Sequence, residues 1–175
     1  MKLYSAAIVT ALGLAASANA AFYLESESND TQATANFIGS YIAPGDGIVV
    51  DGGINSVQAP DVDWFTFTTS NVTQIVVSVF GRPNSNVGDS FLELYDSSGT
   101  LLASDDDSNV NLFSSLEYTT ASGGSWSLKV RKFSDAGVDF NYKMIIGLNI
   151  TPVPTPGAAS LMAVGGLLVA RRRRA

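Results

Sequence analysis

Hydrophobic and polar residues alternate along several short segments in the middle of the chain. An alternation with a period of two places successive side chains on opposite faces of an extended strand, so that one face is buried and the other meets solvent. The clearest segments are residues 63–69, 74–80, 125–131 and 140–148. In the first of them Phe65 and Phe67 fall on one face and Trp64 on the other. These segments predict half-buried strands.

Shorter candidate strands lie between the clear ones, at residues 47–50, 91–95, 100–103 and 115–119. Residues that favour turns separate the segments, at positions 44–47, 51–53, 96–99 and 122–124. About eight short strands joined in this way predict an all-β, antiparallel β-sandwich. No segment between residues 30 and 150 has a sustained helical period, which argues against an α/β fold.

The first twenty residues have the layout of a secretory signal peptide. Lys2 supplies the positive charge, residues 6–16 are apolar, and residues 18–20 form the small-x-small pattern that precedes cleavage before Ala21. We therefore predict that residues 1–20 are a signal peptide and that the protein is exported. A buried N-terminal helix is the alternative.

The C-terminal region predicts a linker followed by an apolar tail. Residues 151–157 contain three prolines, which remove backbone donors and fix φ, so this stretch reads as a linker. Residues 158–170 are apolar, and the run is shorter than the roughly 18 residues of a stable spanning helix. Under the positive-inside rule, the arginines that follow would stay on the cytoplasmic side. They are Arg171, Arg172, Arg173 and Arg174. We interpret residues 158–175 as a sorting or transmembrane tail; a disordered basic tail is the alternative.

This tail resembles the PEP-CTERM sorting signal, in which a Pro-Glu-Pro motif precedes a short apolar helix and an arginine cluster. The motif stands here as Pro154-Thr155-Pro156, so Thr155 departs from the pattern. The resemblance implies transient anchoring in the inner membrane and cleavage near the prolines by an exosortase-type enzyme. It also implies delivery to the cell envelope, the cell surface or the exterior.

Composition limits the chemistry of the single domain that we predict at residues 21–150. The chain has no cysteine and no histidine, which excludes disulfides, thiolate zinc sites and serine–histidine triads. A glycosidase would need two carboxylates at a fixed separation, and the sequence singles out no such pair. All sixteen acidic residues lie between Glu25 and Asp139, and residues 21–150 contain only five basic residues. We expect a non-catalytic protein that binds no nucleic acid and is compatible with cations.

Four blocks of the chain, taken in order, resemble the bacterial pre-peptidase C-terminal domain. They are ESESNDT followed by ATA at residues 25–35, DVDWFTF at 61–67, LELYDSSGTLLA at 92–103 and GSWSLKV at 124–130. The resemblance covers roughly residues 25–148 and implies a jelly-roll-like β-sandwich, often appended to secreted proteases. No protease domain accompanies the blocks here, so an accessory role to a protease does not transfer.

Oxygen-bearing side chains in the first two blocks predict a calcium site. Glu25, Glu27 and Asn29 alternate along a short extended segment, and hard cations take six to eight oxygen ligands. The resemblance implies that the acidic residues leading into the Asp-x-Asp-Trp-Phe strand complete the site. The candidate ligands of Ca²⁺ are Glu25, Glu27, Asn29, Asp30, Asp61 and Asp63. The alternative is that Asp30-Thr31 caps a turn that Asp63 tethers by hydrogen bonds.

Two further features allow alternative interpretations. Residues 105–107 are three consecutive aspartates, which could hold another cation or form a solvated turn. Trp64 could stack on a sugar ring of an exopolysaccharide or contact a matrix protein, because an exposed indole suits both. It could equally be a buried anchor of the core.

Overall fold

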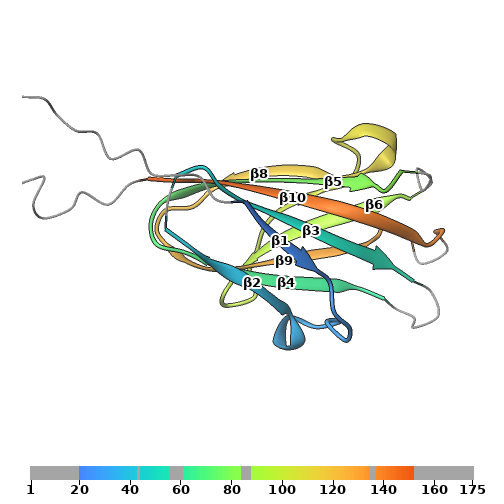
Figure 1. The fold of residues 1–175 in the computed structure, drawn as a ribbon, viewed down its shortest axis with the longest axis horizontal. Coiled ribbons are helices and arrows are strands. Elements are labelled where there is room, and N and C mark those ends of the chain that lie inside the picture. The colour runs from blue at the N-terminus through green and yellow to red at the C-terminus, as the bar shows by residue number, and fades with distance from the viewer. Residues whose placement is uncertain (1–19, 43, 56–60, 84–87, 135–136, 152–175) are drawn as a thin grey trace, which may run out of the picture.

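The computed structural model describes residues 20–42, 44–55, 61–83, 88–134 and 137–151, which form a sandwich of two β-sheets (Figure 1). Sheet A has the strand order β1-β3-β10-β5-β8, and sheet B has the order β2-β4-β9-β6-β7. The described residues contain only two short 3-10 helices, η1 (Gln32–Thr34) and η3 (Val110–Leu112). The all-β prediction is confirmed, although ten strands form rather than about eight.

Most neighbouring strands are antiparallel, as predicted, but each sheet has one parallel pair at its edge. In sheet A the strands are β1 (Ala20–Leu24), β3 (Asp46–Ile54), β10 (Phe140–Ile150), β5 (Thr73–Gly81) and β8 (Ser115–Thr119). In sheet B they are β2 (Asn36–Tyr41), β4 (Asp63–Thr69), β9 (Gly124–Lys132), β6 (Ser90–Asp96) and β7 (Leu101–Asp105). The parallel pairs are β1 with β3 and β2 with β4. They bring the N-terminal segment onto both sheets.

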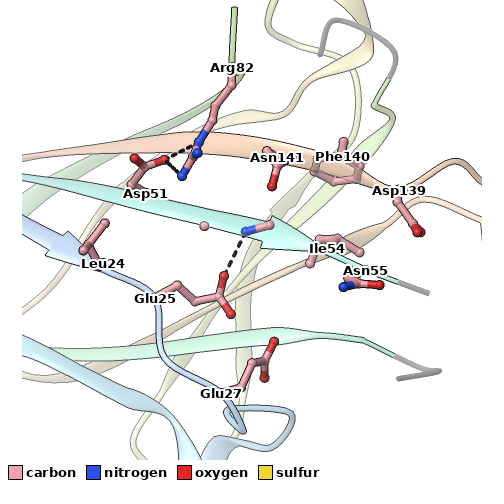
Figure 2. Close-up of a pocket in the computed structure, with 12 residues that line it drawn as sticks. Leu24, Glu25, Glu27, Asp51, Ile54, Asn55, Arg82, Asp139, Phe140 and Asn141 are labelled. Atoms are coloured by element: carbon pink, nitrogen blue, oxygen red, sulfur yellow. Dashed lines mark hydrogen bonds and ion pairs between the residues drawn. The ribbon is translucent and has the colours of Figure 1, made fainter. Parts of the chain in front are cut away.

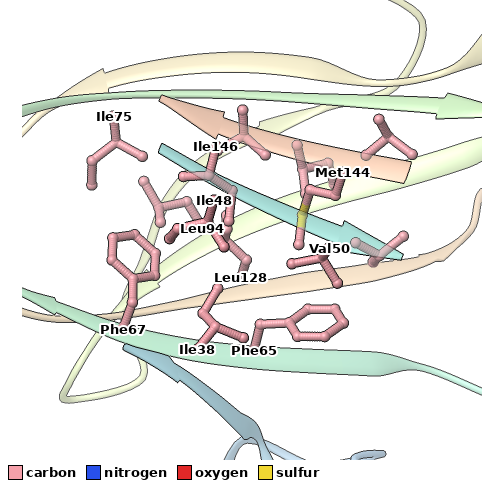
Figure 3. Packing of buried hydrophobic residues seen from close by; sticks show 14 of the residues in the cluster. Ile38, Ile48, Val50, Phe65, Phe67, Ile75, Leu94, Leu128, Met144 and Ile146 are labelled. Atoms are coloured by element: carbon pink, nitrogen blue, oxygen red, sulfur yellow. The ribbon is translucent and has the colours of Figure 1, made fainter. Parts of the chain in front are cut away.

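The core lies between the two sheets and is built from the inward faces that the alternation predicts (Figure 3). Phe65 and Phe67 are fully buried, whereas Trp64 lies half-buried on the outer face of β4. Trp126 is also buried, and its Nε1–H donates to Thr69 Oγ1 at 3.0 Å. Each fully buried apolar side chain of this size stabilises the fold by about 1.5–3 kcal/mol, so this core is the main source of stability.

One turn prediction is wrong, because β3 continues through residues 51–53, where we expected a turn. Gly52 lies beside Tyr142 of β10, and a Cβ atom on Gly52 would come within 2.7 Å of the Tyr142 ring. The glycine therefore makes room for a buried tyrosine and does not reverse the chain.

The predicted terminal segments fall mostly outside the described residues. The expected cleavage point between Ala20 and Ala21 lies at the start of β1. Residues 1–19 of the predicted signal peptide lie outside the described part of the chain, as do residues 152–175, including the sorting motif and the four arginines. Among the described residues, no helix is long and apolar enough to cross a membrane.

Candidate metal centre

The acidic segment after β1 lies between the two sheets at one end of the sandwich. Its first residue continues the pairing of β1 with β3, because the Glu25 N–H donates to the Asp51 carbonyl at 3.0 Å. Further along, the Trp64 N–H donates to the Asn29 carbonyl at 3.0 Å, which fastens the segment to β4 in sheet B. Residues 25–29 therefore bridge sheet A and sheet B, and they bring their side chains to the start of β4.

The predicted ligands come together in two overlapping groups. Carboxylate oxygens of Glu25, Glu27 and Asp63 all lie within 4.8 Å of one another, and so do those of Glu27, Asp30 and Asp61. Glu27 belongs to both groups. The five carboxylates come from segments that are more than 30 positions apart in the sequence, so the fold itself creates the cluster.

Asn29, the sixth predicted ligand, is completely buried beside β4. Its Nδ2 donates to Asn36 Oδ1 at 3.3 Å and to the Trp64 carbonyl at 3.4 Å. These two bonds use the nitrogen and leave the amide oxygen, Oδ1, without a hydrogen-bond partner. The orientation of the amide is therefore set by its donors, and a free acceptor remains.

Three buried oxygen atoms of the predicted ligands lack a hydrogen-bond partner: Asn29 Oδ1, Asp61 Oδ1 and Asp63 Oδ1. Asn29 and Asp63 are both fully buried, and a buried polar atom without a partner costs about 1–3 kcal/mol. All three atoms are acceptors. What the cluster lacks is therefore a donor or a cation.

Burial and mutual repulsion shift the proton affinities of the cluster. Burial raises the pKa of Asp63 to about 9, and the nearby Glu25 carboxylate adds to the rise. A hydrogen bond opposes it, since Tyr142 Oη donates to Asp63 Oδ2 at 2.5 Å. Burial also raises the pKa of Asp61, and the Glu27 carboxylate adds to it. Bringing these carboxylates together without a counter-charge is thus unfavourable for their ionised forms.

The pKa of Glu25 rises less than that of Asp63, because Glu25 is less deeply buried. Burial raises its pKa to about 7, while the Gly53 N–H, which donates to Glu25 Oε2 at 2.8 Å, counteracts the rise. Within the described part of the chain, no lysine or arginine forms an ion pair with any of the five carboxylates. Among the described residues, no basic side chain therefore compensates the negative charge of these carboxylates through an ion pair.

A cleft of about 640 Å³ leads from solvent to the cluster (Figure 2). Glu25 and Glu27 line one side of it, and Arg82, paired with Asp51 at 2.5 Å, lies across from them. A small ion can reach Glu25 and Glu27 through this opening.

The chemistry of the donor set fits Ca²⁺. Every candidate ligand atom is an oxygen, five of the six side chains are carboxylates, and the sixth is an amide. Ca²⁺ takes six to eight oxygens in flexible geometry, whereas Mg²⁺ demands a near-ideal octahedron and keeps several waters. A mixed set of this size from two chain segments suits the larger ion.

The turn considered as an alternative to a metal site is present, and Thr31 of the predicted Asp30-Thr31 pair forms its cap. Thr31, rather than Asp30, caps η1: its Oγ1 accepts from the Thr34 N–H at 3.3 Å, and Thr34 Oγ1 accepts from the Thr31 N–H at 3.2 Å. The hydrogen bond that Asp63 accepts comes from Tyr142. Neither Asp30 nor Asp63 makes the turn contacts that this alternative requires.

The three consecutive aspartates divide between two roles. Asp105 stabilises a turn, since its carboxylate accepts from the N–H groups of Ser108 and Ser115 at 3.1 and 2.7 Å. Asp106 and Asp107 lie close to Asp89, which immediately precedes β6. Carboxylate oxygens of these three residues are within 4.8 Å of one another. The prediction of a turn is therefore correct for Asp105.

The outer face of sheet B surrounds Trp64 with polar and aromatic side chains. Its ring lies 5.0 Å from that of Tyr95, and the Lys129 Nζ is 5.6 Å from its centroid. Glu93 joins the two neighbours, because it pairs with Lys129 Nζ at 2.9 Å and accepts from the Tyr95 hydroxyl at 2.9 Å. The sequence analysis identified Trp64 but missed these neighbours, which become visible only when the register of β4, β9 and β6 is known.

Comparison with protein families agrees with this architecture. Residues 61–132 match the family model of the bacterial pre-peptidase C-terminal domain. Such domains are β-sandwiches that are typically non-catalytic and occur in secreted or extracellular bacterial proteins. Over this stretch, from Asp61 to the end of β9, the chain is similar to a pre-peptidase C-terminal domain. The acidic segment at residues 25–30 precedes the matched region.

Solved structures with related folds include two bacterial proteins of about the same size as the domain. The pre-peptidase C-terminal domain of a collagenase from Bacillus anthracis is 18% identical, covers 63% of this chain and 93% of its own, and has a TM-score of 0.45. PliG of Aeromonas hydrophila, a periplasmic inhibitor of g-type lysozyme, is 7% identical, covers 75% and 99%, and has a TM-score of 0.45. A comparison with curated proteins finds no match.

Proposed function

We propose that this chain is an exported, non-catalytic β-sandwich protein that binds Ca²⁺ at residues 25–30 and at the start of β4. The observation that carries the proposal is the pair of buried, unpartnered oxygens on Asp61 and Asp63, whose carboxylates both lie close to that of Glu27. Asn29, fully buried beside β4, has a third unpartnered oxygen. When bound, the ion supplies the positive charge that these ligands lack. It would replace repulsion between carboxylates by coordination.

The consequence of ion binding is mechanical stabilisation. The candidate ligands come from the segment after β1, which pairs with sheet A, and from the approach to β4 in sheet B. An ion held by both fastens the sheets together at one end of the sandwich. This role suits a protein outside the cell, where it replaces the disulfides that the cysteine-free chain cannot form.

Thermal unfolding in calcium and in chelator tests this function. A ligand that binds only the native state stabilises it by about 2.7 kcal/mol at a hundredfold excess over its Kd. For a domain of this size we expect Tm to be roughly 8–10 °C higher with Ca²⁺ than with EGTA. Mg²⁺ at equal ionic strength is the control and should give a much smaller rise. Equal Tm values in calcium and in chelator would rule out the site.

We propose the route of export and sorting from the sequence. The signal peptide directs secretion, and the tail at residues 158–175 anchors the protein transiently in the inner membrane. An exosortase-type enzyme then cleaves near Pro154 and Pro156 and releases the domain to the envelope, cell surface or extracellular matrix. The match of residues 61–132 to the pre-peptidase C-terminal family model supports the extracellular destination, because such domains occur in secreted proteins.

A second candidate function is adhesion to an exopolysaccharide or a matrix protein through the outer face of sheet B. Trp64 lies there half-buried between Tyr95 and Lys129, which gives an aromatic surface beside a positive charge. Replacing Trp64 by alanine should abolish retention on exopolysaccharide purified from the producing cells, because stacking contacts are lost. Phe133→Ala, at a half-exposed ring, is the matched control. Unchanged retention of the Trp64 variant would exclude this face.

A further inference from the structure

The outer face of sheet A carries an apolar groove of about 400 Å³ that the calcium site does not use. Its floor crosses three adjacent strands, because Gly47 of β3 pairs with Gly147 of β10, and Gly147 pairs with Val76 of β5. Val76 and Ile145 flank the floor and are 39% and 47% exposed. Sheet A therefore exposes an apolar hollow to solvent.

The backbone conformation at these two floor positions does not require glycine. Neither has a positive φ, since the positive-φ glycines of the described chain are at other positions. A Cβ on Gly47 would lie 3.6 Å from the Ile146 carbonyl oxygen, and one on Gly147 would lie 4.0 Å from that of Val76. Both are ordinary contacts. A glycine inside a strand weakens it and often marks a close approach of another backbone.

The chain itself supplies an apolar segment close to this groove. The described part of β10 ends at Ile150, three positions beyond Gly147. The six residues at 152–157 can reach about 20 Å, at roughly 3.3 Å per residue. A helix of thirteen residues, the length of the apolar stretch 158–170, is about 20 Å long, and the four strands β1, β3, β10 and β5 are about 14 Å across. The segment can reach the groove and is long enough to cross it.

Charge and shape both favour this occupant. Four arginines follow the apolar segment, and the domain between the two terminal regions has sixteen acidic and only five basic residues. Opposite charges attract, which favours an approach of the tail to the domain. Gly165 and Gly166 lie within the segment, and small residues allow two backbones to approach closely.

We propose that, before sorting cleavage and away from a bilayer, residues 158–170 lie in the groove over Gly47 and Gly147. Removal of the tail then uncovers an apolar surface on the mature protein. In this proposal, the groove and the membrane compete to bind residues 158–170. This inference is independent of the calcium site, but the uncovering rests on the proposed cleavage of the tail.

Cysteine crosslinking tests the placement, because the natural chain has no cysteine. The full chain carrying Val76→Cys and Ala163→Cys is synthesised without membranes or detergent and treated with a short bis-maleimide. We expect an intramolecular product, seen as a crosslinked monomer by mass, at a yield at least about tenfold above a control, because the contact raises the effective concentration of the thiols. The control pairs Ala163→Cys with Ser104→Cys, an exposed position on sheet B.

A third pair and a groove-filling variant complete the test. Val76→Cys with Ala11→Cys reports whether the N-terminal apolar segment occupies the groove instead. Gly147→Val, added to the first pair, should fill the hollow and reduce the crosslink to the control level, while Tm stays equal or rises. Equal yields for Val76 and Ser104, a preferred crosslink to Ala11, a crosslinked dimer or a yield unaffected by Gly147→Val would each overturn the proposal.

Discussion

Replacing Asp63 by asparagine is expected to stabilise the calcium-free protein and to abolish its response to calcium. Asp63 is completely buried among acidic neighbours, so its charge is unfavourable when no ion is bound. Asparagine has nearly the same shape and can still accept the hydrogen bond from Tyr142. At pH 8, below its pKa of about 9, the folded state keeps Asp63 protonated, which costs free energy because the unfolded chain releases that proton. Removing this cost should stabilise the calcium-free protein by about 3 kcal/mol, in the range of about 3–5 kcal/mol typical of an uncompensated buried charge.

The opposite signs of the two effects make this variant informative. A purely structural carboxylate would lose stability in both conditions when its charge is removed, whereas a metal ligand loses stability only in calcium. Urea unfolding of the native protein and the variant, in Ca²⁺ and in EGTA, separates the two cases. Glu117→Gln, an equivalent change at an exposed carboxylate of β8, should leave both curves unchanged. If the Asp63 variant keeps the calcium shift, Asp63 is not a ligand.

Strand alternation predicted the interior strands of this fold closely. Residues 63–69 form β4 with the predicted bounds, and β9 and β10 differ from their predictions by one or two residues at an end. These strands pack one face against the core, and their inner positions are completely or almost completely buried. Where one face of a strand is completely buried and the other is exposed, the two-residue period shows which side chains face the core.

The two parallel edge strands were not predicted, and their sequences explain why. In β1 the outward residues are Phe22 and Leu24, which are 61% and 63% exposed, so hydrophobicity does not mark the buried face. In β2 the pairing shifts register between Phe37 and Gly39, which interrupts the period. Both strands are held by main-chain pairing at a sheet edge, and a hydrophobic pattern carries little information about such pairing.

The candidate site was predictable in composition but not in detail. Local alternation and a family resemblance pointed to the acidic segment and to Asp61 and Asp63. The hydrogen bond from Tyr142 to Asp63 joins residues 79 positions apart, and the one from Gly53 to Glu25 spans 28. Such contacts depend on how β10 and β3 pair, which one sequence does not specify. The alternation did place Tyr142 on the inward face.

In chelator, Tm is expected to fall steadily as the pH rises from 5 to 9. Glu25 and Asp63 have pKa values raised to about 7 and about 9, from about 4 in the unfolded chain, and Asp61 shifts in the same direction. A raised carboxylate pKa means that the folded state holds a proton that the unfolded state has lost. The stability from these protons is complete below pH 4 and disappears as the pH passes through the folded-state values.

Calcium should flatten or reverse this profile, because its ligands bind in their ionised forms and the ion becomes more stabilising as the pH rises. The pH range from 5 to 9 suits this measurement, since the chain has no histidine that would titrate within it. The lowered pKa values of Glu93 and Asp105 act only near and below pH 4. Thermal unfolding at unit pH steps, with and without Ca²⁺, measures both curves. Asp63→Asn should flatten the chelator curve, whereas a calcium-free protein that becomes more stable toward pH 9 would contradict the carboxylate cluster as described.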